Sequence, residues 1–231
     1  MRIFAMSDLH LSEASGKPMD VFGPRWKNHT EKMKKNWDEM LNSEDVMIIS
    51  GDVSWGLKLE EAVPDFQWIH ERPGLKLITK GNHDLWWSSL TKMNSLFEDI
   101  LFIQGGSVVV GDTAVCGTRG WGLKQEDRQD WTEHDDKIYR REQIRMKMAL
   151  DAAESTGASR IILSLHYPPT DHHGSNTAFT ELIEQYPVTC VLYGHLHGED
   201  AYQHAFNGWK NGIQYRLMSS DFLSYKPERI L

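Results

Sequence analysis

Residues 2–10 read RIFAMSDLH, a short apolar run that ends in two side chains able to bind a metal ion, Asp8 and His10. Four later runs repeat this arrangement: VMIISG before Asp52, LKLITKG before Asn82, His83 and Asp84, RIILSL before His166, and TCVLYG before His195 and His197. Apolar runs without alternation are typical of strands that are buried on both faces of a sheet. Because the carboxyl ends of parallel strands border one crevice, these side chains are predicted to converge on a single site.

The overall composition of the 231 residues is that of an ordinary globular protein, with 40% hydrophobic and 25% charged residues. We expect one domain over residues 1–231, because no linker-like boundary interrupts the pattern. No stretch approaches the roughly 20 apolar residues of a membrane helix, and the first residues lack the features of a signal peptide. The predicted protein is therefore cytoplasmic and has no membrane partner. The net charge of −8 argues against broad binding of nucleic acid.

The predicted elements alternate between strands and helices, with short antiparallel strands in two places. Apolar runs predict strands over 2–6, 46–50, 75–79, 160–165 and 188–193, and helical spacing predicts helices over 29–42, 59–70, 86–97, 138–155 and 177–185. Turn residues predict short strands over 100–103, 107–111 and 113–117, and a last pair over 201–206 and 213–218. The tail 227–231 is expected to be loosely held. We predict a mixed α/β fold in which a parallel and an antiparallel piece stack as two sheets with helices outside.

Each of these polar motifs at the end of a predicted strand has an ordinary structural explanation when it is considered alone. Gly51-Asp52 is a common turn dipeptide, and Asn82 or Asp84 could cap a helix. The segment Gly194-His195-Leu196-His197-Gly198 is more specific, because two imidazoles at alternate positions between glycines are typical of ligands. Five such ends together indicate one metal site.

The donor chemistry of this set is carboxylate, amide oxygen and imidazole, without thiolate. Such a mixed set suits manganese, iron, zinc or cobalt better than calcium, and we favour manganese or iron. The two cysteines, Cys116 and Cys190, lie in apolar runs and are expected to be buried small side chains outside the site.

The ordered motifs Asp-x-His, Gly-Asp, Gly-Asn-His-Asp, a lone His and Gly-His-x-His resemble those of the calcineurin-like metallophosphoesterase superfamily. The resemblance spans residues 8–197 and implies a four-layer αββα sandwich of two stacked mixed sheets flanked by helices. It implies two adjacent metal ions that activate a water molecule. One ion would be held by Asp8, His10 and His197, and the other by Asn82, His166 and His195, with Asp52 bridging them.

The resemblance also implies that His83 is a general acid or phosphate donor rather than a ligand, and that Asp84 holds its ring in the useful tautomer. One departure is visible, because the family usually has Gly-Asp-x-x-Asp or Gly-Asp-x-x-Asn, whereas Trp55 stands at the last position here. The loss affects the surroundings of the metal site more than metal binding itself. Trp55 is expected to pack beside the cleft.

The predicted activity is hydrolysis of a small phosphate monoester or diester, with two metal ions as cofactors. Arg119, in the glycine-rich segment 117–122, is a candidate contact for the substrate phosphate. The following segment 124–137 is expected to be a solvated loop or helix start, or else a cover for the cleft. Two alternatives are a non-catalytic interaction module on the same fold and a nuclease. The loops around Trp26, Trp55 and Arg119 are expected to select the substrate.

Overall fold

The computed structural model describes residues 1–124 and 131–231. In chain order, its elements are β1 (Ile3–Met6), the 3-10 helices η1 (Met19–Phe22) and η2 (Pro24–Trp26), α1 (His29–Met40), β2 (Val46–Ile49), α2 (Leu59–His70), β3 (Leu75–Thr79), α3 (Leu90–Met93), β4 (Ile100–Ile103), β5 (Gly106–Val110), β6 (Thr113–Gly117), α4 (Glu133–Glu154), β7 (Arg160–Ser164), α5 (Ala178–Ile183), β8 (Val188–Tyr193), α6 (Glu199–Tyr202), β9 (Gly208–Lys210), β10 (Ile213–Leu217) and β11 (Glu228–Arg229).

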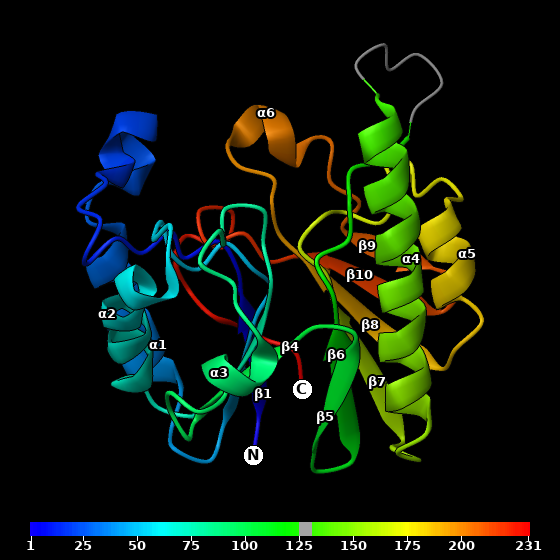
Figure 1. Ribbon diagram of the computed structural model, residues 1–231, viewed down its shortest axis with the longest axis horizontal. Helices are drawn as coiled ribbons and strands as arrows, with labels where there is room; N and C mark the ends of the chain where they lie inside the picture. The colour runs from blue at the N-terminus through cyan, green and yellow to red at the C-terminus, as the bar shows by residue number, and fades with distance from the viewer. Residues whose placement is uncertain (125–130) are drawn as a thin grey trace.

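Two sheets stack at the centre of the molecule. The first has the strand order β11-β1-β2-β3-β4, and the second has the order β5-β6-β7-β8-β10-β9. Helices α1 and α2 cover the outer face of the first sheet, and α4 and α5 cover the outer face of the second (Figure 1). The predicted fold class, two mixed sheets flanked by helices, is confirmed.

The uninterrupted apolar strands are explained by burial on both faces. In β1, Ile3 and Ala5 belong to the core between the two sheets, whereas Phe4 and Met6 belong to the core beneath the outer helices. Successive side chains of a strand point to opposite faces, so a strand between two apolar layers needs apolar residues at every position. The same division separates Val46 from Met47 in β2.

The antiparallel strands lie at the edges of the sheets and do not form a separate piece. Strands β1 to β4 pair in parallel, as do β6, β7, β8 and β10, whereas β11, β5 and β9 add antiparallel edges. The expectation of one parallel and one antiparallel piece was therefore wrong. Each sheet combines both kinds of pairing.

Three local predictions were also wrong. Residues 201–206 do not form a strand, because α6 occupies Glu199–Tyr202 and the partner of β10 is β9. Only Leu90–Met93 is helical within the predicted helix 86–97. The tail is ordered by sheet pairing, since β11 pairs with β1.

Helix α4 begins earlier than predicted because Thr132 caps it. The Thr132 side chain accepts from the backbone of Asp135, and the Asp135 side chain accepts from the backbone of Thr132, which forms a capping box. The remainder of the segment 124–137, residues 125–130, lies outside the described residues. Within the described part of the chain, none of the helices has the length and apolar character needed to cross a membrane.

Candidate metal centre

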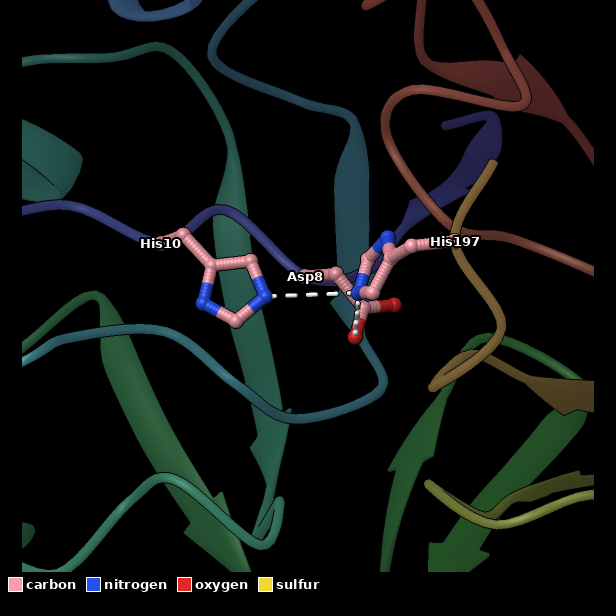
Figure 2. Close-up of side chains that lie close together, drawn as sticks. All are labelled: Asp8, His10 and His197. Carbon is pink, nitrogen blue, oxygen red and sulfur yellow. Dashed lines mark hydrogen bonds and ion pairs between the residues drawn. The ribbon is translucent and has the colours of Figure 1, made fainter. Parts of the chain in front are cut away.

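The sheet topology brings together the strand ends that are followed by the expected metal ligands. Strands β1, β2 and β3 are neighbours in one sheet, and β7 and β8 are neighbours in the other. Asp8 and His10 follow β1, and His197 follows β8. The Nε2 atoms of His10 and His197 lie 3.3 Å apart, and His197 Nε2 lies 3.2 Å from Asp8 Oδ1. Figure 2 shows the two rings and the carboxylate turned toward one another.

A second group lies beside the first. Nε2 of His166 lies 2.7 Å from Asn82 Oδ1 and 3.4 Å from Asp52 Oδ2, and Nδ1 of His195 lies 2.8 Å from the same Asn82 oxygen. Donor atoms of Asp8, Asp52 and His166 also fall within 4.8 Å of one another. Asp8 therefore approaches both groups. All seven side chains expected to bind metal lie in one cluster.

The glycines in these motifs allow adjacent loops to pack closely. A Cβ atom on Gly194 would collide with the side chains of Ser7 and Asp8, and one on Gly81 would collide with Asp52. Any other residue at these positions would push the loops that carry the donors apart. The Gly-Asn-His-Asp and Gly-His-x-His motifs are thus explained by contact between loops.

The backbone at four of the expected ligands is left-handed. The φ angles are 59° at Asp8, 46° at His10, 51° at Asp52 and 73° at His195. This region is uncommon for residues other than glycine, and residues in such sparsely populated conformations tend to cluster at functional sites.

The hydrogen bonds of the imidazoles leave the correct nitrogens for metal binding. Nδ1 of His166 lies 3.0 Å from the carbonyl oxygen of Ser50, to which it can donate, so Nε2 is the nitrogen that faces the cluster and would bind a metal once it loses its proton. Nδ1 of His197 similarly faces Asp221 Oδ1 at 2.9 Å. A carboxylate or carbonyl behind the ring is the usual partner of a metal-binding histidine. The described donors therefore fit a divalent metal.

Burial and neighbouring charges separate the histidine pKa values. Burial lowers the pKa of His10 to about 3 and that of His195 to about 4. Burial also opposes the protonation of His166 and His197, but Asp52 and Asp8 raise the pKa of His166 to about 9, and Asp8 and Asp221 raise that of His197 to about 10. Protons therefore balance the buried carboxylates here, and metal binding would displace them.

The sequence predicts that Asp84 orients the ring of His83, whereas its observed hydrogen bonds are to backbone groups. Its fully buried carboxylate accepts hydrogen bonds from the backbone N–H groups of Gly81, Asp52 and Val53 at 2.7–3.0 Å. Within the described residues, the Asp84 carboxylate therefore bonds to these backbone groups and not to the ring of His83. Asp84 therefore fixes the Gly51-Asp52 loop against the Gly81-Asn82 loop.

His83 lies beside the cluster without entering it. Its backbone N–H donates to Asp52 Oδ1 at 2.8 Å, while its ring lies 4.5 Å from the Trp55 ring and 5.8 Å from the His10 ring. The Trp55 indole stacks on His10, so Trp55 packs beside the cleft as expected. His83 and Trp55 both line a pocket of about 720 Å³ that also reaches His10 and His197.

Arg119 touches the cluster through its backbone, while its side chain packs on an aromatic ring. Its guanidinium packs 4.6 Å from the centroid of Trp121, and its carbonyl oxygen accepts from the backbone of His166 and Tyr167. It is not among the described residues that line the pockets next to the expected ligands. The binding of substrate by Arg119 stays a prediction.

Asp221 is the functional residue that sequence reasoning missed. Besides His197, its carboxylate accepts from the backbone N–H of Gly198 at 3.1 Å and forms an ion pair with Arg25. The signal was present, because Asp221 follows the apolar strand β10 as the other site residues follow theirs.

Comparison with known proteins agrees with this geometry. A family model described as calcineurin-like phosphoesterase matches residues 1–199. The chain belongs to this family. The calcineurin-like phosphoesterases generally use divalent metals, and this membership supports phosphoesterase activity for the chain.

Relatives and a solved structure extend the comparison. The chain is 25% identical to the Gene 66 protein of Mycobacterium phage D29 over 196 residues, which cover 84% of the chain and 78% of that protein. It is 31% identical to the Gene 66 protein of Mycobacterium phage L5 over 78 residues, 34% of the chain and 37% of that protein. The crystal structure of phosphopantetheinyl hydrolase (PptH) from Mycobacterium tuberculosis superposes with a TM-score of 0.52 at 13% identity, covering 100% of the chain and 95% of that protein. This likeness shows a shared fold.

Proposed function

We propose that the protein hydrolyses phosphate esters with two metal ions bound at the strand-end cluster. The observation that carries the proposal is the facing pairs of imidazole nitrogens, His10 with His197 and His166 with His195, each 3.3 Å apart. Neighbouring imidazoles that point their nitrogens at one another beside buried carboxylates are arranged as metal ligands. Manganese and iron are favoured for these donors, and zinc and cobalt also suit them.

Each expected ligand has a defined place in this proposal. Asp8, His10 and His197 would hold one ion, and Asn82, His166 and His195 the other, with Asp52 between them. When bound, the ions would supply positive charge to the phosphoryl oxygens and make water a better nucleophile near neutral pH. Asp221 and the Ser50 carbonyl orient two of the rings.

His83 is proposed to protonate the oxygen of the leaving group. Its ring borders the pocket beside the cluster, and its backbone N–H is bound to Asp52. Trp55 fixes the position of the ring by packing against it. A general acid at this point assists most when the leaving alcohol is a poor leaving group.

The test is hydrolysis by protein that has first been freed of metal with a chelator. We expect Mn²⁺ to restore hydrolysis of p-nitrophenyl phosphate, bis-p-nitrophenyl phosphate or a cyclic nucleotide, and Ca²⁺ to restore far less. The variant Asp52→Asn tests the cluster in the same assay. Its control is Asp136→Asn, which changes a partly exposed carboxylate on α4. Absence of metal-dependent hydrolysis of every ester in the panel would contradict the proposal.

A further inference from the structure

The cluster of expected ligands lies between two pockets of different character. The first, called the apolar pocket, has a volume of about 720 Å³ and reaches His10, His83 and His197. Its remaining wall is mainly apolar, with Met19, Phe22, Pro24, Trp26 and Trp55, and also includes Arg25, Glu199 and Asp200. The second, called the polar pocket, has a volume of about 570 Å³ and reaches His195. Each pocket therefore borders a different part of the same cluster.

The surface beyond the apolar pocket exposes several large apolar side chains beside the charged side chains of Lys17 and Glu61. An adjoining hollow of about 610 Å³ shares Trp55 and His83 with it and is lined by Leu57 and Leu85. Phe22 is 55% exposed, and Leu57 and Leu85 are each 64% exposed. Large apolar side chains gathered at a pocket mouth are typical of a binding surface. Two cations border this wall, and both are engaged: Arg25 by Tyr202 and Glu199, and Lys17 by the face of the Trp55 ring.

The polar pocket presents a different chemistry. Its wall includes the polar side chains of Thr170, Asp171, His172 and His204, together with the rings of Trp121 and Tyr167 and the apolar Leu123, Pro168 and Leu196. Asp171 is held in place by its own loop, since it accepts from the backbone of His173 and Ser175 at 3.0 Å. The Tyr167 ring lies 4.2 Å from that of His195, so this pocket continues directly to the cluster. Hydroxyl groups of a ligand would find hydrogen-bond partners here.

His83 lies on only one side of this arrangement. It lines the apolar pocket and the adjoining hollow, and it is absent from the described residues that line the polar pocket. A leaving group that receives a proton from His83 must therefore depart into the apolar pocket. The group retained on phosphorus would then extend toward His195.

We propose that the substrate is a phosphodiester that joins an apolar alcohol to a polar, hydroxyl-rich alcohol, and that the apolar alcohol is the leaving group. This inference rests on the proposed phosphoesterase function and specifies its substrate class. A monoester would leave one of the two pockets unused, whereas a diester has a substituent for each.

The reaction is a hydrolysis that consumes one water molecule. The water oxygen forms a bond to phosphorus, and the bond between phosphorus and the oxygen of the apolar alcohol breaks. His83 gives a proton to that oxygen, and the proton lost by water restores His83 through solvent. The products are the free apolar alcohol and the phosphate monoester of the polar alcohol.

The decisive experiment uses the metal-loaded protein and the mixed diester 2-phenylethyl glycerol phosphate. Products are separated by liquid chromatography and identified by mass spectrometry, in water enriched with ¹⁸O. We expect 2-phenylethanol and ¹⁸O-labelled glycerol phosphate to exceed 2-phenylethyl phosphate by at least about tenfold, as burial of an aromatic group favours one orientation. Equal amounts of the two monoesters, or an excess of 2-phenylethyl phosphate, would overturn the assignment of the leaving group.

The same assay separates this inference from the proposed function. Hydrolysis of 2-phenylethyl phosphate or glycerol phosphate without hydrolysis of the diester would overturn the diester assignment and leave phosphoesterase activity standing. Failure on all of these esters and on p-nitrophenyl phosphate would instead reject the proposed function.

Two variants test the pockets separately. Phe22→Gln should raise the KM for 2-phenylethyl glycerol phosphate roughly five- to tenfold, with a smaller effect on methyl glycerol phosphate. His204→Ala should raise the KM for 2-phenylethyl glycerol phosphate more than that for 2-phenylethyl methyl phosphate, which lacks the hydroxyl groups. Met148→Gln, at a 54% exposed position of α4, is the matched control for Phe22. Equal effects of each variant on both of its substrates would contradict the two-pocket assignment.

Discussion

The indole of Trp55 stacks on the imidazole of His10, with ring centroids 4.9 Å apart and planes inclined by 22°. The ammonium of Lys17 lies 3.1 Å from the centroid of the same indole, and the His83 ring lies 4.5 Å from it. Trp55 therefore connects an expected metal ligand with the expected proton donor.

Replacing Trp55 with Ala should loosen the His10 ring. An aromatic pair contributes on the order of 1 kcal/mol beyond burial, so we expect affinity for Mn²⁺ to fall about five- to tenfold. Calorimetric titration of the metal-free protein measures this change. Trp209→Ala is the control, because that indole is 68% exposed on β9. Unchanged metal affinity in the Trp55 variant would show that the stack does not position His10.

Replacing Asp52 with Asn should reduce the number of bound metal ions from two to one or none. The change removes a buried negative charge that lies 3.4 Å from His166 and is the proposed link between the two ions. Elemental analysis after gel filtration measures the metal content. Asp8→Asn provides a comparison, because Asp8 also approaches both groups. Two ions retained at full occupancy in the Asp52 variant would rule out its bridging role.

Asp221→Asn should weaken metal binding about 10- to 100-fold, the usual effect of losing the carboxylate behind a metal-binding histidine. The variant keeps the size of the side chain but removes the charge that faces His197 Nδ1 at 2.9 Å. Metal titration again provides the measurement. Arg25→Gln removes the ion pair to Asp221 and leaves the His197 contact, so it should have the smaller effect. A larger loss of metal affinity in Arg25→Gln than in Asp221→Asn would contradict the role assigned to Asp221.

His83→Ala should slow esters with poor leaving groups about 10²- to 10⁴-fold. Esters of p-nitrophenol should be affected much less, because p-nitrophenolate leaves without a proton. The measurement compares kcat for an alkyl and an aryl ester in the same variant. If both classes lose activity equally, His83 acts on binding or on the metals and not as the general acid.

Asp65 makes a separate prediction about stability. Burial raises its pKa to about 6, although Ser54 and the backbone of Glu13 donate to it. The unfolded chain ionises near pH 4, so between about pH 4 and pH 6 the folded state holds an extra proton and stability falls as pH rises. Asp65→Asn should remove this dependence. The free energy of unfolding of the variant, taken relative to that of the parent, should therefore be roughly 2–3 kcal/mol higher at pH 7 than at pH 4. Urea unfolding of the metal-free proteins at several pH values measures the difference between variant and parent. Asp20→Asn, at an exposed position of η1, is the control. A difference between the Asp65 variant and its parent that does not change with pH would contradict the prediction.

The sequence predicted the central strands because each lies between two apolar layers and is therefore apolar at most of its positions. It predicted the cluster because parallel strands end at one edge. It did not predict α6, because Ala201-Tyr202-Gln203-His204 alternates like a strand. In the structure, Tyr202 packs on the second core from the end of α6, and Ala205 and Phe206 pack there from the segment that follows the helix.

The roles of Asp84 and Asp221 depend on loop packing that no local pattern encodes. Asp84 contacts the Gly51-Asp52 loop, about thirty residues earlier, and the direction of its carboxylate is set by those backbone N–H groups. Asp221 follows β10 after Met218, Ser219 and Ser220, but it is a lone carboxylate without the paired pattern of the Asp-x-His and His-x-His motifs. The pairing of β11 with β1 joins opposite ends of the chain and leaves no trace in a short segment.

The left-handed backbone at Asp8, His10, Asp52 and His195 has an evolutionary consequence. Glycine adopts these angles without steric penalty, and removing the buried charges would relieve their desolvation. A lineage released from selection for the reaction could therefore replace these residues with little harm to folding. Loss of activity is the energetically easy direction for this scaffold, so inactive descendants should keep the sheets and lose the donors first.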